Sequence, residues 1–116
     1  MTDRRNSVLK NSKNSLCRVK PMITIERTQK TLTVSGHAGY AERGKDIVCE
    51  AVTSQVQTLT ASIEQLTNNK PAFSLSSGFY ELSLEGLGDK SLFLVSAFMV
   101  GMRLLQDGYP AYVKVI

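Results

Sequence analysis

A strand pattern gives way to a helix pattern within the stretch Gly36-His37-Ala38-Gly39-Tyr40-Ala41-Glu42-Arg43-Gly44-Lys45-Asp46-Ile47-Val48-Cys49. This stretch contains the protein's one histidine, His37, and one of its two cysteines, Cys49. The strand pattern ends at His37, and the helix pattern begins just after Asp46. We therefore expect an imidazole and a thiol to face each other across a short loop that contains two glycines.

Two short strands precede this stretch and form a predicted hairpin. Ile23 and Ile25 alternate with polar residues, and Leu32 and Val34 do the same after a polar turn. This period of two is typical of strands with one buried face. Continued past the second strand, the period places His37 on the face opposite Leu32 and Val34.

A helix follows the loop, because apolar residues then recur at steps of three and four. They are Cys49, Val52, Val56, Leu59, Ile63 and Leu66. This spacing predicts a helix with one apolar stripe. Asp46 is a favourable N-cap whose carboxylate is placed to accept the amide hydrogen of Cys49. Residues 68–71, Asn-Asn-Lys-Pro, are expected to end the helix.

The rest of the chain is predicted to contain a hairpin, a helix and a strand, at residues 73–84, about 90–106 and 111–116. Ser77-Gly78 marks the hairpin turn, and Asp89 or Ser91 is the expected cap of the helix. The fold class is therefore α/β (α+β), with a mostly antiparallel sheet and two helices in the order β-β-α-β-β-α-β. Because the second helix is apolar nearly all round in its first half, we expect a homodimer.

Size and composition indicate one globular domain. The chain has 116 residues, of which 42% are hydrophobic and 21% charged. Two cysteines do not form a disulfide framework, so we expect reduced thiols and a cytoplasmic protein. One histidine and two cysteines favour no metal site, and no cofactor is expected. No apolar run reaches the roughly 20 residues of a membrane-spanning helix.

The positive charge is concentrated in residues 1–21, which carry six basic residues and one acidic residue, a net charge of +5. Residues 22–116 carry eight basic and nine acidic residues, a net charge of −1. We interpret 1–21 as a disordered extension that contains an exposed Cys17, and Met22 as a possible true start. The alternative is a basic arm that binds RNA.

The pair His37 and Cys49 predicts nucleophilic chemistry. Only a thiolate attacks carbonyl carbon efficiently, and a free cysteine is mostly protonated at neutral pH. The first turn of a helix and a nearby imidazolium would both lower the pKa of Cys49. The amides of that turn are candidates for an oxyanion hole. Asp46 is a third candidate catalytic residue, as a cap first and as an orienter of His37 second.

The loop is expected to close over a peptide substrate, because glycines at both ends allow hinge motion. Its candidate substrate-contacting residues are Gly36, Ala38, Gly39, Tyr40 and Gly44. Each feature also has a structural interpretation. Cys49 continues the apolar stripe and would suit a helical core, a histidine at a strand end is often a surface residue, and Tyr40 could simply cover the sheet.

The sequence motifs of this stretch resemble those of one known family. Gly36-His37-Ala38-Gly39-Tyr40-Ala41, followed by Gly44-Lys45-Asp46-Ile47-Val48-Cys49, resembles the ribosomal-processing cysteine protease Prp family. The likeness extends over nearly all of residues 22–116 and leaves the tail outside. It implies an α/β fold in a homodimer, and an endopeptidase of the bacterial cytoplasm. Its substrate would be large-subunit ribosomal protein twenty-seven, which loses a short N-terminal extension around ribosome assembly.

The resemblance also implies roles for individual residues. The family's catalytic dyad falls on His37 and Cys49, its motif aspartate on Asp46, and the loop between the dyad residues is expected to order over substrate. One departure is Glu50, where the family usually has a small residue. A carboxylate there would oppose thiolate formation, although solvent screens it. Two rivals stay open: a non-catalytic ribosome- or RNA-associated dimeric module, and a protease-like dimer that has lost catalysis.

Overall fold

The computed structural model describes residues 22–39 and 46–116. Its elements are β1 (Ile23–Arg27), β2 (Thr31–Ser35), α1 (Ile47–Leu66), β3 (Phe73–Ser76), β4 (Phe79–Ser83), α2 (Asp89–Gly108) and β5 (Val113–Val115). This order confirms the predicted succession of strands and helices. The expectations for residues 1–21, Tyr40 and Gly44 lie outside the described residues.

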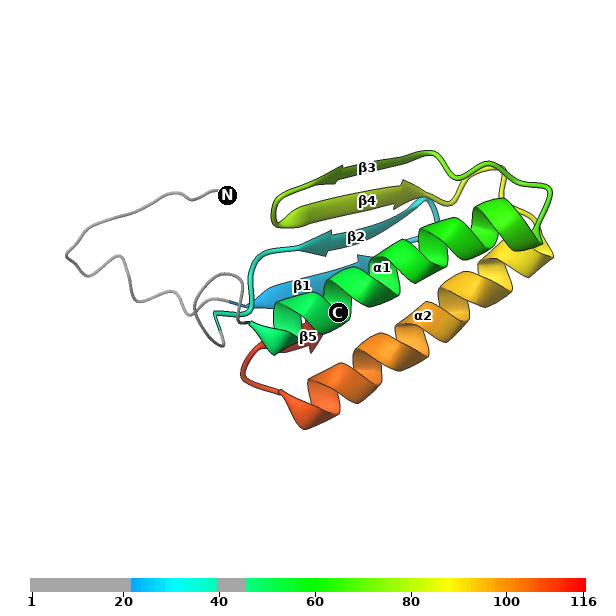
Figure 1. Cartoon of the computed structure of the whole chain (residues 1–116). Helices are drawn as coiled ribbons and strands as arrows, with labels where there is room; N and C mark the ends of the chain where they lie inside the picture. The colour runs from blue at the N-terminus through cyan, green and yellow to red at the C-terminus, as the bar shows by residue number, and fades with distance from the viewer. Residues whose placement is uncertain (1–21, 40–45) are drawn as a thin grey trace.

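The strands form one sheet in the order β3-β4-β2-β1-β5. Three neighbouring pairs are antiparallel and the pair β1·β5 is parallel, so the predicted mostly antiparallel sheet is confirmed. Both helices cover the same face of the sheet (Figure 1). The molecule thus has two layers, and the opposite face of the sheet carries polar residues such as Thr24, Glu26, Thr33 and Glu81.

The core lies between the helices and the sheet. Ile25, Leu32 and Leu82 from the strands meet Ile63 from α1 and Met102 from α2, and all five are fully buried. The inward residues of each strand are two positions apart, whereas those of the helices are three or four apart, as their periods require. This packing holds the start of α1 next to the end of β2.

Two details of the helices differ from the predictions. Leu66, expected on the buried stripe of α1, is 66% exposed because it occupies the last position of the helix, while Val48 is fully buried in the first turn. The N-cap of α2 is Gly88, and no side chain caps it. Ser91 does not cap α2 because its buried hydroxyl donates to Asn69 Oδ1 at 2.6 Å.

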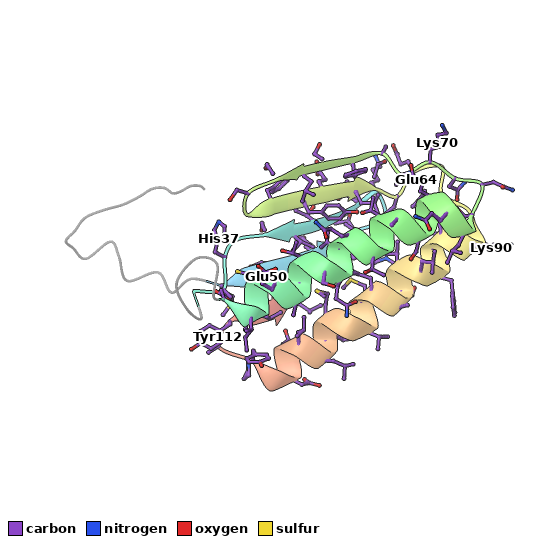
Figure 2. All side chains as sticks on the ribbon, viewed as in Figure 1. His37, Glu50, Glu64, Lys70, Lys90 and Tyr112 are labelled. Carbon is purple, nitrogen blue, oxygen red and sulfur yellow. The ribbon has the colours of Figure 1, made fainter. Side chains whose placement is uncertain are left out.

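The outer face of α2 is apolar. Phe93, Val100 and Leu104 recur at helical spacing and are 75%, 52% and 66% exposed. Exposed Lys90 and Arg103 of α2 flank this apolar stripe. Glu64, Lys70 and Lys90 lie at the end of the molecule opposite to His37 and Glu50 (Figure 2). Within the described residues, neither helix is long and apolar enough to cross a membrane.

Candidate active site

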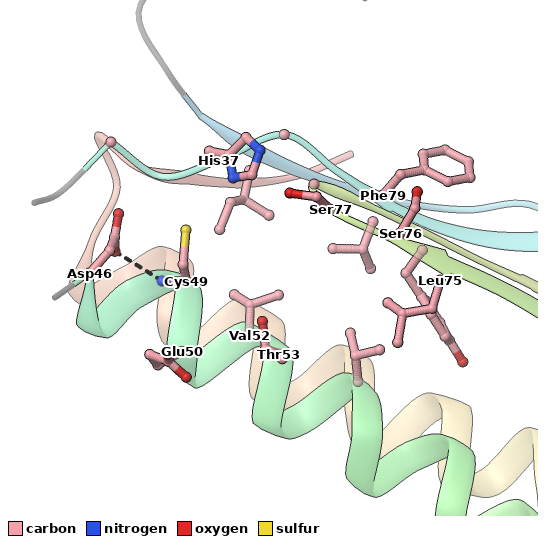
Figure 3. Close-up of a pocket in the computed structure, with 17 residues that line it drawn as sticks. His37, Asp46, Cys49, Glu50, Val52, Thr53, Leu75, Ser76, Ser77 and Phe79 are labelled. Carbon is pink, nitrogen blue, oxygen red and sulfur yellow. Dashed lines mark hydrogen bonds between the residues drawn. The ribbon is translucent and has the colours of Figure 1, made fainter. Parts of the chain in front are cut away.

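A cavity of about 720 Å³ lies between the first turns of α1 and the turn of the β3–β4 hairpin. His37, Asp46, Cys49 and Glu50 all line it, and the imidazole and the sulfur face the same space in Figure 3. The far wall is mostly apolar and includes Val56, Leu75, Phe79 and Tyr80. The structure therefore brings together the two side chains that the sequence singled out, at one end of a groove large enough for several residues of a peptide.

Cys49 is held in the first turn of α1, partly exposed to the cavity and partly packed against the core. The backbone N–H of Ala38 donates to its sulfur at 3.3 Å. Ala38 is fully buried, so this donor is fixed in place. Cys49 thus combines both interpretations of the sequence, because it contacts the core and still presents its sulfur to the cavity.

His37 reaches the cavity because Gly36 ends the strand period. Gly36 has φ +97°, a left-handed conformation that favours glycine, and a Cβ there would collide with the carbonyl oxygen of Met22. The chain therefore turns after Ser35, and His37 lines the same cavity as the inward-facing Val34. The prediction that His37 lies on the face opposite Val34 is wrong for this reason.

Asp46 is the N-cap of α1, as predicted. Its buried carboxylate accepts from the amides of Val48 and Cys49, both at 3.0 Å through Oδ1. The next amide, that of Glu50, donates to the Asp46 carbonyl oxygen at 3.1 Å. Because these three donors are occupied, the first turn of α1 does not offer them as an oxyanion hole in this structure. The Ala38 N–H is instead the backbone donor directed at the sulfur.

The pKa of Cys49 is raised above the ordinary thiol value of 9.0, chiefly because burial disfavours the thiolate. The Ala38 N–H lowers this pKa, whereas the Asp46 and Glu50 charges raise it, and Asp46 also raises it through a hydrogen bond with the thiol. The net lowering of the Cys49 pKa expected from the sequence is therefore wrong, because burial outweighs the groups that favour the thiolate. The prediction that Glu50 opposes ionisation is confirmed in direction.

These observations favour one chemical route. A cysteine thiol is mostly protonated at neutral pH, and the sulfur becomes a good nucleophile when a base removes its proton. Among the described residues, the ring of His37 makes no hydrogen bond to the thiol, but it lines the same cavity (Figure 3). The arrangement allows His37 to act as a general base on the Cys49 thiol if the two side chains come within hydrogen-bond reach.

Two parts of the cavity were not predicted as functional from the sequence: Thr53, one turn along α1 from Glu50, and the hairpin residues around Gly78. Ala38 was predicted to contact substrate, but it is buried and does not line the cavity; its N–H instead donates to the Cys49 sulfur, which was not predicted. The Ser77-Gly78 turn was recognised as a turn, but its place depended on β4 pairing with β2. That pairing sets Phe79 opposite Ser35 and brings the turn to the end of β2. Of the predicted loop residues, Gly36 and Gly39 line the cavity.

Residues 19–114 match the protein family described as Cysteine protease Prp. The chain belongs to this family. A ribosomal processing cysteine protease Prp from Mycoplasma genitalium is 30% identical over 98 residues, which cover 81% of this chain and 94% of that protein. The family membership makes the chain a cysteine protease, and Cys49 is the one cysteine among the described residues.

Solved structures of Staphylococcus aureus Prp share the fold of this Prp-family chain. One, in complex with a covalently linked product peptide, has a TM-score of 0.72 at 19% identity and covers 82% of this chain and 96% of that one. Another, in complex with a substrate peptide, has a TM-score of 0.68 at 17% identity and covers 83% and 97%. The two-layer architecture described above is therefore that of known Prp proteases.

Proposed function

We propose that this chain is an endopeptidase that removes a short N-terminal extension from a ribosomal protein precursor, large-subunit ribosomal protein twenty-seven. The observation that carries the proposal is the cavity shared by Cys49 and His37, which continues into an apolar groove. Its relative from Mycoplasma genitalium is named as a ribosomal processing protease. The apolar wall of the groove suits a peptide with large apolar side chains near the cleaved bond.

The proposed reaction has two stages. The Cys49 sulfur attacks the peptide carbonyl carbon while His37 takes the thiol proton; the C–N bond then breaks, and His37 returns the proton to the leaving amine. A thioester to the N-terminal fragment remains. His37 next accepts a proton from water, whose oxygen attacks the thioester, and the thiol leaves protonated. The Ala38 N–H donates to the sulfur at 3.3 Å and is positioned to stabilise negative charge that forms on the sulfur when the thiol loses its proton.

We also propose that the protein acts as a homodimer in the bacterial cytoplasm. The exposed apolar face of α2, formed by Phe93, Val100 and Leu104, supports this, because single domains this small rarely leave such a stripe in water. A second copy would cover it through the same face. Two cysteines without a disulfide framework support a reducing compartment.

The test is mass spectrometry of the ribosomal precursor incubated with the wild-type protein and with Cys49→Ser. A precursor with a scrambled extension is the matched control. We expect the wild type to release the extension at one bond and to leave the scrambled substrate intact. Cleavage by neither protein would remove this substrate and favour a non-catalytic module, while equal cleavage by both would remove Cys49 from the mechanism.

A further inference from the structure

The turn of the β3–β4 hairpin packs directly on the catalytic imidazole. A Cβ placed on Gly78 would lie 2.5 Å from His37 Nε2, 3.1 Å from Cε1 and 3.2 Å from Cδ2. All three atoms belong to the ring, so the backbone of the turn faces the ring with no side chain between them. In Figure 3 the ring lies between Ser77 of this turn and the sulfur of Cys49.

The same turn is tied to the backbone that precedes His37. The Gly36 N–H donates to the Gly78 carbonyl oxygen at 2.8 Å. This hydrogen bond continues the β2·β4 ladder by one step, beyond the pairing of Ser35 with Phe79. The turn and the histidine are consequently held to each other by the sheet, although 41 positions separate Gly78 from His37 in the sequence.

We propose that Gly78 is a positioning residue. The His37 imidazole packs against the backbone of the hairpin turn at Gly78, and this contact orients the ring toward Cys49. The inference rests on the proposed protease function and adds a second element to its site. His37 is exposed and follows a glycine, so its side chain would otherwise have several rotamers available. The turn closes the space on one side of the ring and thereby limits them.

Glycine is needed at this position for the ring as well as for the backbone. Gly78 has φ +74°, which favours glycine in any case. Gly86 has a similar φ of +80°, but a Cβ there would meet nothing within 4 Å. The two glycines therefore separate the backbone effect from the contact with His37, and Gly86 supplies a matched control.

The experiment compares Gly78→Ala with Gly86→Ala. Both variants carry the same backbone strain, and the added methyl group at position 78 meets only the far end of a side chain that can rotate, so both are expected to fold. A positioned general base accelerates a reaction by about 10²–10⁴-fold, and moving the base loses part of this acceleration. We therefore expect kcat of Gly78→Ala to fall at least about tenfold. KM should change little, and Gly86→Ala should retain wild-type kinetics.

Two readouts isolate the effect on His37. His37 is the protein's one histidine, so its imidazole NMR signals cannot be confused with those of another histidine. Gly78→Ala should shift these signals, whereas Gly86→Ala should not. In a His37→Ala background, adding Gly78→Ala should lower kcat no further, because the residue acts through the ring.

The wild-type protein offers a check that needs no variant. A nuclear Overhauser effect between the Gly78 α-protons and the His37 ring protons is expected. Its absence, or equal kcat and equal imidazole signals for Gly78→Ala and Gly86→Ala, would overturn the proposal even if the wild type cleaves its substrate. A wild type that cleaves nothing would instead count against the proposed function, and the NMR readouts would still test the packing of the His37 ring on Gly78.

Discussion

The two helices have the same length of 20 residues and pack on the same face of the sheet, yet they expose different surfaces. α1 presents polar residues to solvent and begins inside the cavity, with a buried Asp46 capping the turn that carries Cys49. α2 begins at Gly88 without a side-chain cap and exposes an apolar stripe.

The difference separates two tasks. A buried, charged cap fixes the first turn of α1 and so fixes the sulfur, which catalysis requires. The start of α2 carries no reactive group, and its first turn is held by the contact of Ser91 with Asn69. Its outer face instead suits contact with another protein surface. We therefore propose that α1 carries the chemistry and that α2 carries the assembly surface, a division that variants of each helix can test.

The largest effect is expected for the reacting groups beside α1. Cys49→Ser should lower kcat/KM by a factor on the order of 10⁴ or more, because it removes the nucleophile. His37→Ala should lower it by about 10²–10⁴-fold, because it removes the general base. Both are measured by the rate of precursor cleavage. A variant in either position that keeps wild-type activity would break the assignment of chemistry to this cavity.

The next effect concerns α2 and should leave chemistry intact. Phe93→Glu places a charge in the stripe and removes about 1.5–3 kcal/mol of apolar burial from each of the two copies. The dimer should therefore weaken by roughly 10²–10⁴-fold. Analytical ultracentrifugation measures the association. Gln57→Glu, on the exposed polar face of α1, is the control and should associate like the wild type. A Phe93→Glu protein that dimerises normally would remove α2 as the assembly surface.

Asp46 should show a smaller effect, on stability. Asp46→Ala removes the acceptor of two amides and should cost about 1 kcal/mol in the free energy of unfolding, whereas Asp46→Asn retains a cap of similar strength. Denaturant unfolding measures both. Equal losses would show that charge, rather than hydrogen bonding, holds the first turn.

Glu50 should show the smallest effect. Its negative charge raises the pKa of Cys49, so Glu50→Gln should lower that pKa, and the rise of thiol alkylation with pH should move to lower pH. The shift should be small because Glu50 is exposed and screened. Peptide-resolved mass spectrometry measures the alkylation of Cys49. Glu64→Gln, at the far end of α1, should leave it unchanged (Figure 2).

Local patterns were enough to predict most of the fold. The three-and-four spacing after Asp46 predicted α1 and its cap, and alternation predicted the hairpins, because these signals depend on neighbours in sequence. The side of the sheet on which His37 lies was not predictable in this way. It depends on the positive φ of Gly36, which interrupts the period of two.

The electrostatics of the site depended on packing that local patterns do not contain. Burial within the assembled fold raises the pKa of Cys49. The first-turn amides of Val48 and Cys49, which the sequence suggests for an oxyanion hole, donate to Asp46 instead. The contact between Gly78 and the His37 ring depends on the pairing of β2 with β4, which joins segments that are distant in sequence. Prediction from sequence therefore found two side chains that line one cavity, but not the packing and hydrogen bonds around them.

The measurement that tests the central claim most directly is mass spectrometry of acid-quenched protein during cleavage of the precursor, with Cys49→Ala measured beside the wild type. We predict a covalent adduct on the peptide containing Cys49, with the mass of the removed extension less one water, and no product from Cys49→Ala. Product formed by Cys49→Ala at the wild-type rate, or an adduct on another residue, would contradict the account.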